Sequence, residues 1–276
     1  MAVENKVSIY GQILKIRMTS AAKEGEPDTF ISMAVMVMRR RKAGFGIING
    51  SNRIDVVTVV FRAGDQVRRL LDPASPVHEN DMIYVYGVYC TVPVRRRWKC
   101  PSCGELNLLD GTGTFIHPLV FKIEETPEKL NVPQITRPMA FGLIREMDEI
   151  SNRIKIMGNL CRDPTFYRAE NGTAVCTYQI ATDRCVHLME DPPQIVTDYP
   201  WVRSLGKNAE SDYRHLKTGS LVYIDGSVQS RRQYKRTLQC GYCGEKTRIV
   251  DRDGTMDIVP FEVEYLRNYV SPEVDV

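Results

Sequence analysis

Hydrophobic and polar residues alternate along most of the chain, in short runs that end at glycine, proline or aspartate. The runs are rich in valine, isoleucine, tyrosine and threonine, which is typical of half-buried β-strands. Five runs lie in the first half of the chain, at residues 7–16, 30–38, 55–61, 82–89 and 118–123. Five more lie in the second half, at 153–160, 174–182, 199–205, 221–228 and 261–266. Between the third and fourth run of each half lies a helix-compatible stretch, at 66–71 and 209–217. The pattern predicts an all-β protein with one helix in each half.

The two halves also repeat each other in sequence. The segment NKVSIYGQIL matches NRIKIMGNLC with Gly11 on Gly158, and a later match places Gly87 on Gly226. Five strands with a helix between the third and fourth indicate a five-stranded Greek-key barrel of the OB type, so the repeat predicts two such barrels in tandem. A stretch with three prolines interrupts the strand pattern. We therefore expect a first OB-fold domain at 1–125, a linker that ends in a short helical turn at 126–150, and a second OB-fold domain at 151–276.

Length and composition fit this picture. A chain of 276 residues, 43% hydrophobic and 26% charged, can bury two domain cores. It contains no run of 18 apolar residues, and MAVENKVSIY lacks the layout of a signal peptide, so we expect a cytoplasmic protein with no membrane partner. In that reducing compartment the eight cysteines are not expected to form disulfides, and a paired Cys-x-x-C indicates metal or redox chemistry.

The net charge of +3 is small, but the cations are concentrated in clusters. RRRWKCPSC and RRQYKRTLQCGYC each place a basic cluster around one aromatic residue, directly before a Cys-x-x-C pair. A single basic run is most often a solvated loop, whereas two at matching positions favour binding of phosphates. Single-strand binders combine cations with aromatic faces on which bases stack. The predicted nucleic-acid-binding residues of the two clusters are Arg95, Arg96, Arg97, Trp98, Lys99, Arg231, Arg232, Tyr234, Lys235 and Arg236.

The Cys-x-x-C pairs lie in the long hairpin expected between strands four and five of each repeat. Each repeat supplies two thiolates, whereas a structural zinc site takes four ligands. We therefore expect zinc as a structural cofactor in one site shared by the two zinc-knuckle-like hairpins, either within a chain or across a dimer. Four free surface thiols are the alternative, and a thioredoxin-like role is disfavoured because no βαβ pattern surrounds the cysteines. The predicted ligands are Cys100, Cys103, Cys240 and Cys243.

Residues 152–236 resemble the bacterial single-stranded DNA-binding protein family, through NRIKIMGNLCRDP, NGTAV and LKTGSLVYIDGSVQSRR. The first repeat resembles the family only in outline. The resemblance implies a stacking tryptophan at Trp201 in the second repeat and a stacking phenylalanine at Phe61 in the first. In the first repeat, Asp55 is expected at the position that matches Trp201. Tyr167, in the hairpin DPTFYRAENGT, is a further candidate, although core packing is the commoner role of an aromatic residue on a strand. The family's four-barrel binding unit implies a homodimer of this two-barrel chain.

Two departures from the family stand out: the Cys-x-x-C hairpins, and an end in SPEVDV in place of an acidic tail with terminal Pro-Phe. They favour a phage- or plasmid-encoded variant and weaken the expectation of partner recruitment through the tail. The sequence carries no P-loop, HExxH, GxSxG or EF-hand motif, so no enzymatic activity is expected. The predicted function is sequence-tolerant binding of single-stranded DNA, with RNA as a further ligand, in replication, recombination or repair. A zinc-organised scaffold or adaptor subunit whose barrels bind protein is the alternative.

Overall fold

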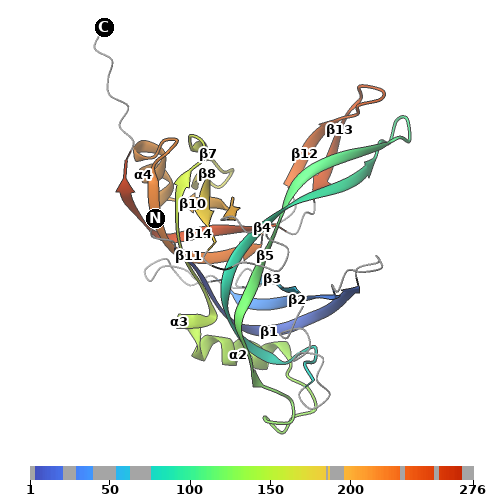
Figure 1. Cartoon of the computed structure of the whole chain (residues 1–276), viewed down its shortest axis with the longest axis vertical. Coiled ribbons are helices and arrows are strands. Elements are labelled where there is room, and N and C mark those ends of the chain that lie inside the picture. Colours follow the sequence, from blue (N-terminus) through green and yellow to red (C-terminus); the bar gives the residue numbers. More distant parts are fainter. Residues whose placement is uncertain are drawn as a thin grey trace.

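The structure is a computed structural model that describes residues 4–20, 29–39, 54–62, 76–184, 186, 196–230, 234–251 and 255–268, and it consists mainly of strands (Figure 1). The first repeat contains β1 (Asn5–Ser20), β2 (Thr29–Met38), β3 (Ile54–Arg62), β4 (Met82–Lys99) and β5 (Leu106–Glu125). Two helices follow, α2 (Arg137–Glu146) and α3 (Asp148–Ser151). The second repeat contains β6 (Asn152–Leu160), β7 (Thr165–Arg168), β8 (Ala174–Asp183), β9 (Thr197–Asp198), β10 (Trp201–Leu205), α4 (Lys207–His215), β11 (Leu221–Ser230), β12 (Tyr234–Gln239), β13 (Lys246–Asp251) and β14 (Met256–Arg267).

Each repeat closes into a ring of five strands. In the first, β1 pairs with β2 and β4, β2 with β3, β4 with β5, and a parallel pairing of Val59 with Ile116 joins β3 to β5. In the second, β6, β8, β10, β14 and β11 close in the same way, with Val202 paired to Ile258. These strand orders confirm the predicted OB-type barrel. Helix α4 confirms the helix expected near 209–217, while 66–71 lies outside the described residues.

An antiparallel pairing of β1 with β6 joins the two barrels into one 12-stranded sheet. Val7 pairs with Ile154, its own counterpart in the repeat, and the pairs on either side are related by the same exchange. The joint is therefore pseudo-two-fold symmetric, and one hydrophobic core cluster contains buried residues of both barrels. Because this core is continuous, the division into domains at 1–125, 126–150 and 151–276 stays a prediction.

The glycines that repeat in the first strand of each barrel lie where the backbone of a neighbouring strand comes close. A Cβ atom on Gly11 would lie 2.3 Å from the carbonyl oxygen of Met36, and one on Gly158 would lie 2.5 Å from that of Ala181. No larger residue fits at either place without a shift of the backbone. The repeated glycine is therefore a requirement of barrel closure.

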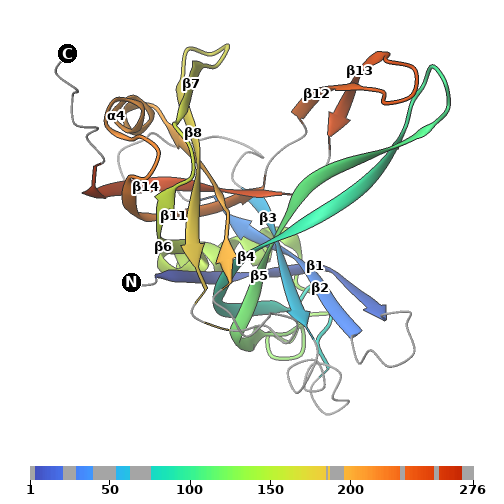
Figure 2. The same ribbon diagram turned by 45° about the horizontal axis from the view of Figure 1, so that its top comes forward.

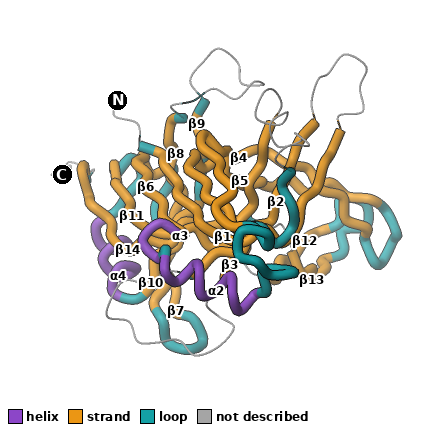
Figure 3. Tube along the Cα trace, turned by 90° about the horizontal axis from the view of Figure 1, so that it is seen from below, coloured by secondary structure: helices purple, strands orange, loops and turns teal. Residues whose placement is uncertain are grey.

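The segment between the barrels ends in two short helices, α2 and α3, which contact the first barrel. Helix α2 begins after Thr136 and buries Ala140 and Ile144 in a cluster with Tyr10 of β1. The side chain of Gln12 donates a hydrogen bond of 2.7 Å to the carbonyl oxygen of Ile135. As a result α2 and α3 lie against the first barrel, whereas α4 lies on the second (Figure 3).

The outer parts of β4 and β5 project from the body as a long hairpin, which we call the first arm (residues 91–114). Strands β12 and β13 form a separate two-stranded hairpin, the second arm (residues 234–251), which runs beside it (Figures 1 and 2). In the described part of the chain, no helix is long and apolar enough to cross a membrane.

Candidate metal centre and nucleic-acid interface

The tips of the two arms bring the four predicted ligands together within one chain. The Sγ atoms of Cys100 and Cys243 lie 3.8 Å apart, and those of Cys103 and Cys240 lie 3.7 Å apart. All four sulfur atoms lie within 4.8 Å of one another. A tetrahedral zinc site with Zn–S bonds of about 2.3 Å has sulfur–sulfur edges of roughly 3.8 Å, so the cluster fits a zinc ion.

Both Cys-x-x-C turns have the same backbone geometry. In the first, the N–H of Cys100 donates to the carbonyl oxygen of Glu105, and the N–H of Gly104 donates to that of Cys100, both at 2.9 Å. The same two bonds recur in the second turn, from Cys240 and Gly244. The two glycines have φ values of 77° and 73°, a conformation that glycine adopts without strain. The glycine after each Cys-x-x-C is thus what folds each pair of thiols toward a common point.

Asn107 ties the first arm directly to the second Cys-x-x-C turn. It is buried, its Nδ2 lies 3.4 Å from the Sγ of Cys240, and its Oδ1 accepts a 2.9 Å hydrogen bond from the N–H of Gly241. Hydrogen bonds from the backbone N–H of Cys243 and from this amide lower the pKa of Cys240 to about 6. Counted from the second cysteine of each Cys-x-x-C pair, Thr247 is the residue of the second arm that matches Asn107. The contact that Asn107 makes between the arms is therefore not symmetric.

Residues of the first arm alternate between two faces. One face of β4 is exposed and carries three of the predicted cations, Arg95, Arg97 and Lys99. The other face carries Arg96 and Trp98, which are half-buried. Trp98 pairs across the hairpin with Asn107, and cross-strand partners share a face, so its ring lies on the side of the second arm. Trp98 is therefore a half-buried residue on the side of the second arm.

The second basic cluster is described only in its backbone. Tyr234, Lys235 and Arg236 belong to β12 and pair with residues 249–251 of β13. Their side chains, and the whole of Arg231 and Arg232, lie outside the described residues. Their role in binding stays a prediction.

Trp201 lies half-buried on the outer face of β10, where it can meet a ligand. The guanidinium of Arg162 lies 5.1 Å from the centre of its ring and donates a 2.9 Å hydrogen bond to Gln179. Tyr199, two residues earlier, is exposed on the same side of the alternating pattern. Sequence reasoning missed Tyr199, although its spacing from Trp201 was a usable signal. Tyr167 is exposed on β7.

Phe61 is a correction to the predicted site. It is 1% exposed, and its ring packs edge-on against Phe121 with centroids 5.1 Å apart, so it offers no face to a base. The parallel pairings make Val59 the counterpart of Val202. The counterpart of Phe61 is then the buried Ser204.

The same register corrects the position opposite the tryptophan. Thr58, not Asp55, is the counterpart of Trp201, and Asp55 is the counterpart of Asp198. The outer face of β3 therefore has no aromatic residue at the place where β10 carries Trp201. Among the described residues of β3, the first repeat therefore has no equivalent of the aromatic face at β10.

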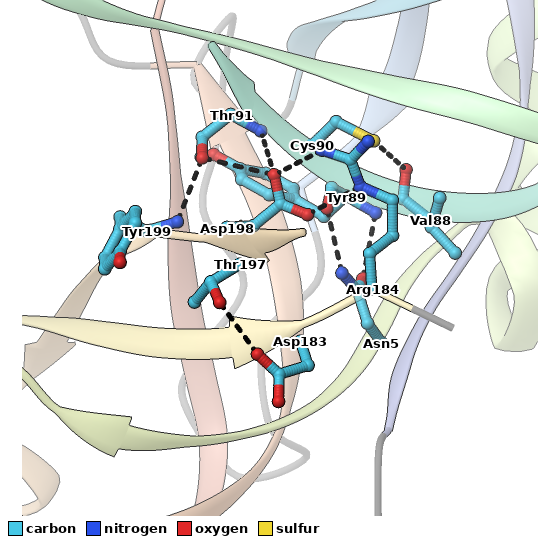
Figure 4. A network of polar contacts seen from close by, with 10 residues as sticks. All are labelled: Asn5, Val88, Tyr89, Cys90, Thr91, Asp183, Arg184, Thr197, Asp198 and Tyr199. Atoms are coloured by element: carbon cyan, nitrogen blue, oxygen red, sulfur yellow. Dashed lines mark hydrogen bonds and ion pairs between the residues drawn. The ribbon is translucent and has the colours of Figure 1, made fainter. Parts of the chain in front are cut away.

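A buried ion pair fixes the root of the first arm to the second barrel (Figure 4). Asp198 accepts hydrogen bonds of 2.9 and 2.8 Å from Arg184, and both side chains are almost completely buried. Asp198 also accepts a 2.7 Å bond from the N–H of Thr91, the residue at the root of the arm. The hydroxyl of Thr91 in turn accepts a 2.9 Å bond from the N–H of Tyr199. The arm and the aromatic face are thus joined through one residue.

The first barrel repeats this arrangement. Asp55 accepts two bonds, of 2.7 and 2.6 Å, from Arg39, and a 3.0 Å bond from the hydroxyl of Ser230 at the root of the second arm. Each arm is therefore anchored at its root to the opposite barrel and at its tip to the other arm. This reciprocal anchoring holds both arms in a defined direction.

The fold and this surface define an OB-type protein with an aromatic face and two basic arms. The model of the single-strand binding protein family matches residues 151–250. A single-stranded DNA-binding protein of Neisseria meningitidis serogroup A is 33% identical over 119 residues, which are 41% of this chain and 68% of that protein. One from Staphylococcus epidermidis is 32% identical over 84 residues, 30% of this chain and 62% of the relative. The chain therefore belongs to the single-strand binding protein family.

Solved structures extend the likeness to the whole fold. The wild-type single-stranded DNA binding protein from Thermus aquaticus superposes with a TM-score of 0.55 at 15% identity, over 96% of this chain and 94% of that one. A deletion mutant of the same protein covers 99% of this chain and 100% of its own, with a TM-score of 0.54 and 15% identity. At this identity the match concerns the fold alone, and it includes the first repeat, which the family model does not match.

Proposed function

We propose that this chain is a non-enzymatic protein that binds single-stranded DNA with little sequence preference, in replication, recombination or repair. The observation that carries the proposal is the family match across the second repeat, the repeat that presents Trp201 on an accessible barrel face. Stacking on one aromatic ring contributes about 1–3 kcal/mol for each base and tolerates every base. The basic arms supply cations for the phosphates. In this proposal the single-stranded DNA lies between the arms and the outer face of β10, which carries Trp201.

Titration of the intrinsic tryptophan fluorescence with oligo(dT), oligo(dA) and a duplex of equal length tests the proposal. We expect saturable quenching by both single strands and weak binding of the duplex. Affinity should fall with salt by about 0.7 log units per log unit for each phosphate neutralised. Equal affinity for the duplex, or a flat salt response, would contradict the proposal. No binding of either single strand would favour the alternative of a scaffold whose basic arms are only solvated.

Zinc is the proposed occupant of the four-cysteine cluster. The sulfur–sulfur distances and the two matching turns support it, because four thiolates are a common ligand set of structural zinc. When bound, the ion would hold the tips of the two arms together. Metal analysis of protein purified under reducing conditions should find one zinc per chain.

A homodimer is the proposed assembly, because it would bring four barrels to one binding unit. Light scattering should then give twice the 31.5 kDa of one chain. A mass of one chain at micromolar concentration would mean that two barrels suffice or that assembly needs DNA.

A further inference from the structure

The four cysteines at the tips of the arms make two sulfur contacts that cross from one arm to the other. The Sγ atom of Cys103 in the first arm lies 3.7 Å from that of Cys240 in the second, and the Sγ atoms of Cys100 and Cys243 lie 3.8 Å apart. In each contact one cysteine is exposed, Cys103 or Cys243, and its partner is buried. The cluster therefore consists of two cross-arm pairs, each with one thiol open to solvent and one shielded from it.

Contacts that involve no metal hold the two tips together. The Oδ1 atom of Asn107 in the first arm accepts a 2.9 Å hydrogen bond from the N–H of Gly241 in the second. Its Nδ2 donates a 3.2 Å bond to the carbonyl oxygen of Glu105 and lies 3.4 Å from the Sγ of Cys240. Asn107 is buried, and a buried amide that bonds two backbone groups is costly to displace. The cross-arm pairs therefore stay in contact when the four cysteines are free thiols.

Thiols placed in this way meet the requirements for a disulfide that forms through a sulfenic acid. A thiol oxidised by a peroxide becomes a sulfenic acid, which either condenses with a second thiol or is oxidised further. In each pair the exposed thiol is the one that a peroxide reaches, and its buried partner is already in contact with it. Condensation with that partner is therefore favoured over further oxidation.

We propose that the four-cysteine cluster is an oxidation site at which hydrogen peroxide forms a disulfide within each cross-arm pair. The sulfur atom of the exposed cysteine attacks the peroxide, the O–O bond breaks, and a sulfenic acid and one water result. The sulfur atom of the buried cysteine then attacks the sulfenic sulfur, the S–S bond forms, and the hydroxyl group leaves with the thiol proton as a second water. In each pair two thiols are oxidised and one peroxide is reduced. The two disulfides are Cys103–Cys240 and Cys100–Cys243.

The consequence is a second way of joining the tips of the arms. Disulfides between the arms hold the tips as the proposed zinc would, whereas a disulfide within each Cys-x-x-C pair would leave the arms unlinked. The oxidised cluster binds no zinc, because a structural zinc site of cysteines takes thiolates. The inference depends neither on DNA binding nor on zinc, since four free thiols at these positions react in the same way.

Peptide mapping without reduction tests which sulfur atoms join. Trypsin cleaves after lysine and arginine, so it releases one Cys-x-x-C pair in peptide 100–122 and the other in peptide 237–246. The full chain is purified under reducing conditions, freed of reductant, treated with hydrogen peroxide, alkylated with N-ethylmaleimide and digested. The two peptides should appear as one species that holds two disulfides and no alkylated cysteine. The treated chain should carry four fewer reactive thiols than the untreated chain.

Variants that keep two of the four cysteines test the pairing itself. Cys100→Ser/Cys243→Ser leaves Cys103 with Cys240, and this variant should form one disulfide between the two peptides. The matched control, Cys103→Ser/Cys243→Ser, leaves the two buried cysteines. Under the same treatment the control should keep both of those thiols, because neither is open to the peroxide.

The variant Asn107→Ala tests whether the tips stay together without a metal. Loss of the amide contacts should move the disulfides from between the arms to within each Cys-x-x-C pair. The linked species should then fall, and each peptide should carry an internal disulfide. Thr247→Ala, at the matching position of the second arm, is the control and should map like the wild type.

Separate peptides from the wild-type chain, each with an internal disulfide, would overturn the proposal. Alkylation of all four cysteines after peroxide treatment, or their conversion to sulfinic acids, would overturn it as well. Disulfides that link two chains, seen as a doubled mass on a non-reducing gel, would assign the thiols to contacts between copies and would also contradict it. None of these outcomes bears on the binding of single-stranded DNA, so the proposed function is tested separately.

Discussion

The outer faces of β3 and β10 occupy equivalent places in the two barrels but carry different side chains. The face at β10 presents Tyr199, Trp201 and Arg203, whereas the face at β3 presents Val56, Thr58 and Val60 at the matching positions. The barrels share a strand order, so the difference is one of surface chemistry. The second barrel presents aromatic side chains on this face, and the first barrel contributes an arm whose root contacts that face.

What the repeats keep in common lies inside the fold. The side chain of Asn5 bonds the N–H and the carbonyl oxygen of Tyr89, both at 2.9 Å, and Asn152 does the same for Val228 at 2.9 and 2.8 Å. A buried amide that satisfies two backbone groups is expensive to replace. The comparison teaches that the positions fixing the barrel carry the same residue in both copies, while the outer-face positions that we propose meet the ligand carry different ones.

Removal of one cysteine pair should have the largest effect. The change Cys240→Ser/Cys243→Ser should abolish essentially all zinc binding, because two ligands cannot complete a tetrahedral site. Metal analysis and a cobalt titration measure it, with Cys90→Ser as the control thiol outside the cluster. Retention of half the zinc would mean that each arm binds metal alone, and the shared site would be wrong.

Loss of either buried carboxylate should come next. Asp198→Asn should lower the free energy of unfolding by about 3–5 kcal/mol, because it removes the carboxylate charge that neutralises the buried guanidinium of Arg184. Asp55→Asn should act in the same direction, since its pair with Arg39 repeats the arrangement. Urea denaturation measures both, and Asp110→Asn, in an exposed pair with Arg95, is the matched control with an effect below about 1 kcal/mol. A small effect at Asp198 would show that the ion pair does not anchor the arm.

The stacking face gives an effect of intermediate size. Trp201→Ala should weaken binding of oligo(dT) by about 1–3 kcal/mol, whereas Thr58→Ala at the matching place should change it little. Anisotropy titrations compare the two variants, with thermal melts as the control for folding. Equal losses would mean that both barrels contact DNA through these strands, which would break the comparison.

The smallest effect is expected at the first arm's tryptophan. Trp98→Ala should weaken binding by about 1 kcal/mol, at the low end for a stacked base, because the half-buried ring lies on the side of the second arm. The same titration with Trp98→Phe as the conservative control checks it. A loss of binding free energy as large as that of Trp201→Ala would mean that the single-stranded DNA lies between the two arms.

The alternation of polar and apolar residues was sufficient to predict the ten barrel strands, because each strand has one buried face. The four cysteines were also predictable, since two ligands in each repeat require a shared site. The burial of Phe61 could not be predicted, because the sequence match around β3 does not fix how residues of β3 align with those of β10. A shift of one residue in this alignment moves a ring from the surface to the core. The Arg184–Asp198 pair and the clamp at Asn107 have no local sequence signal, since their partners meet only in the folded chain.

The central claim is that the second barrel, and not the first, stacks bases. The chain has two tryptophans, so the variant Trp98→Phe leaves Trp201 as the sole fluorescent tryptophan. Titration of this variant with oligo(dT) at low salt should quench its emission in step with binding followed by anisotropy. Binding with unchanged tryptophan emission would contradict the account, because the bound DNA would then make no contact with Trp201 on the outer face of β10.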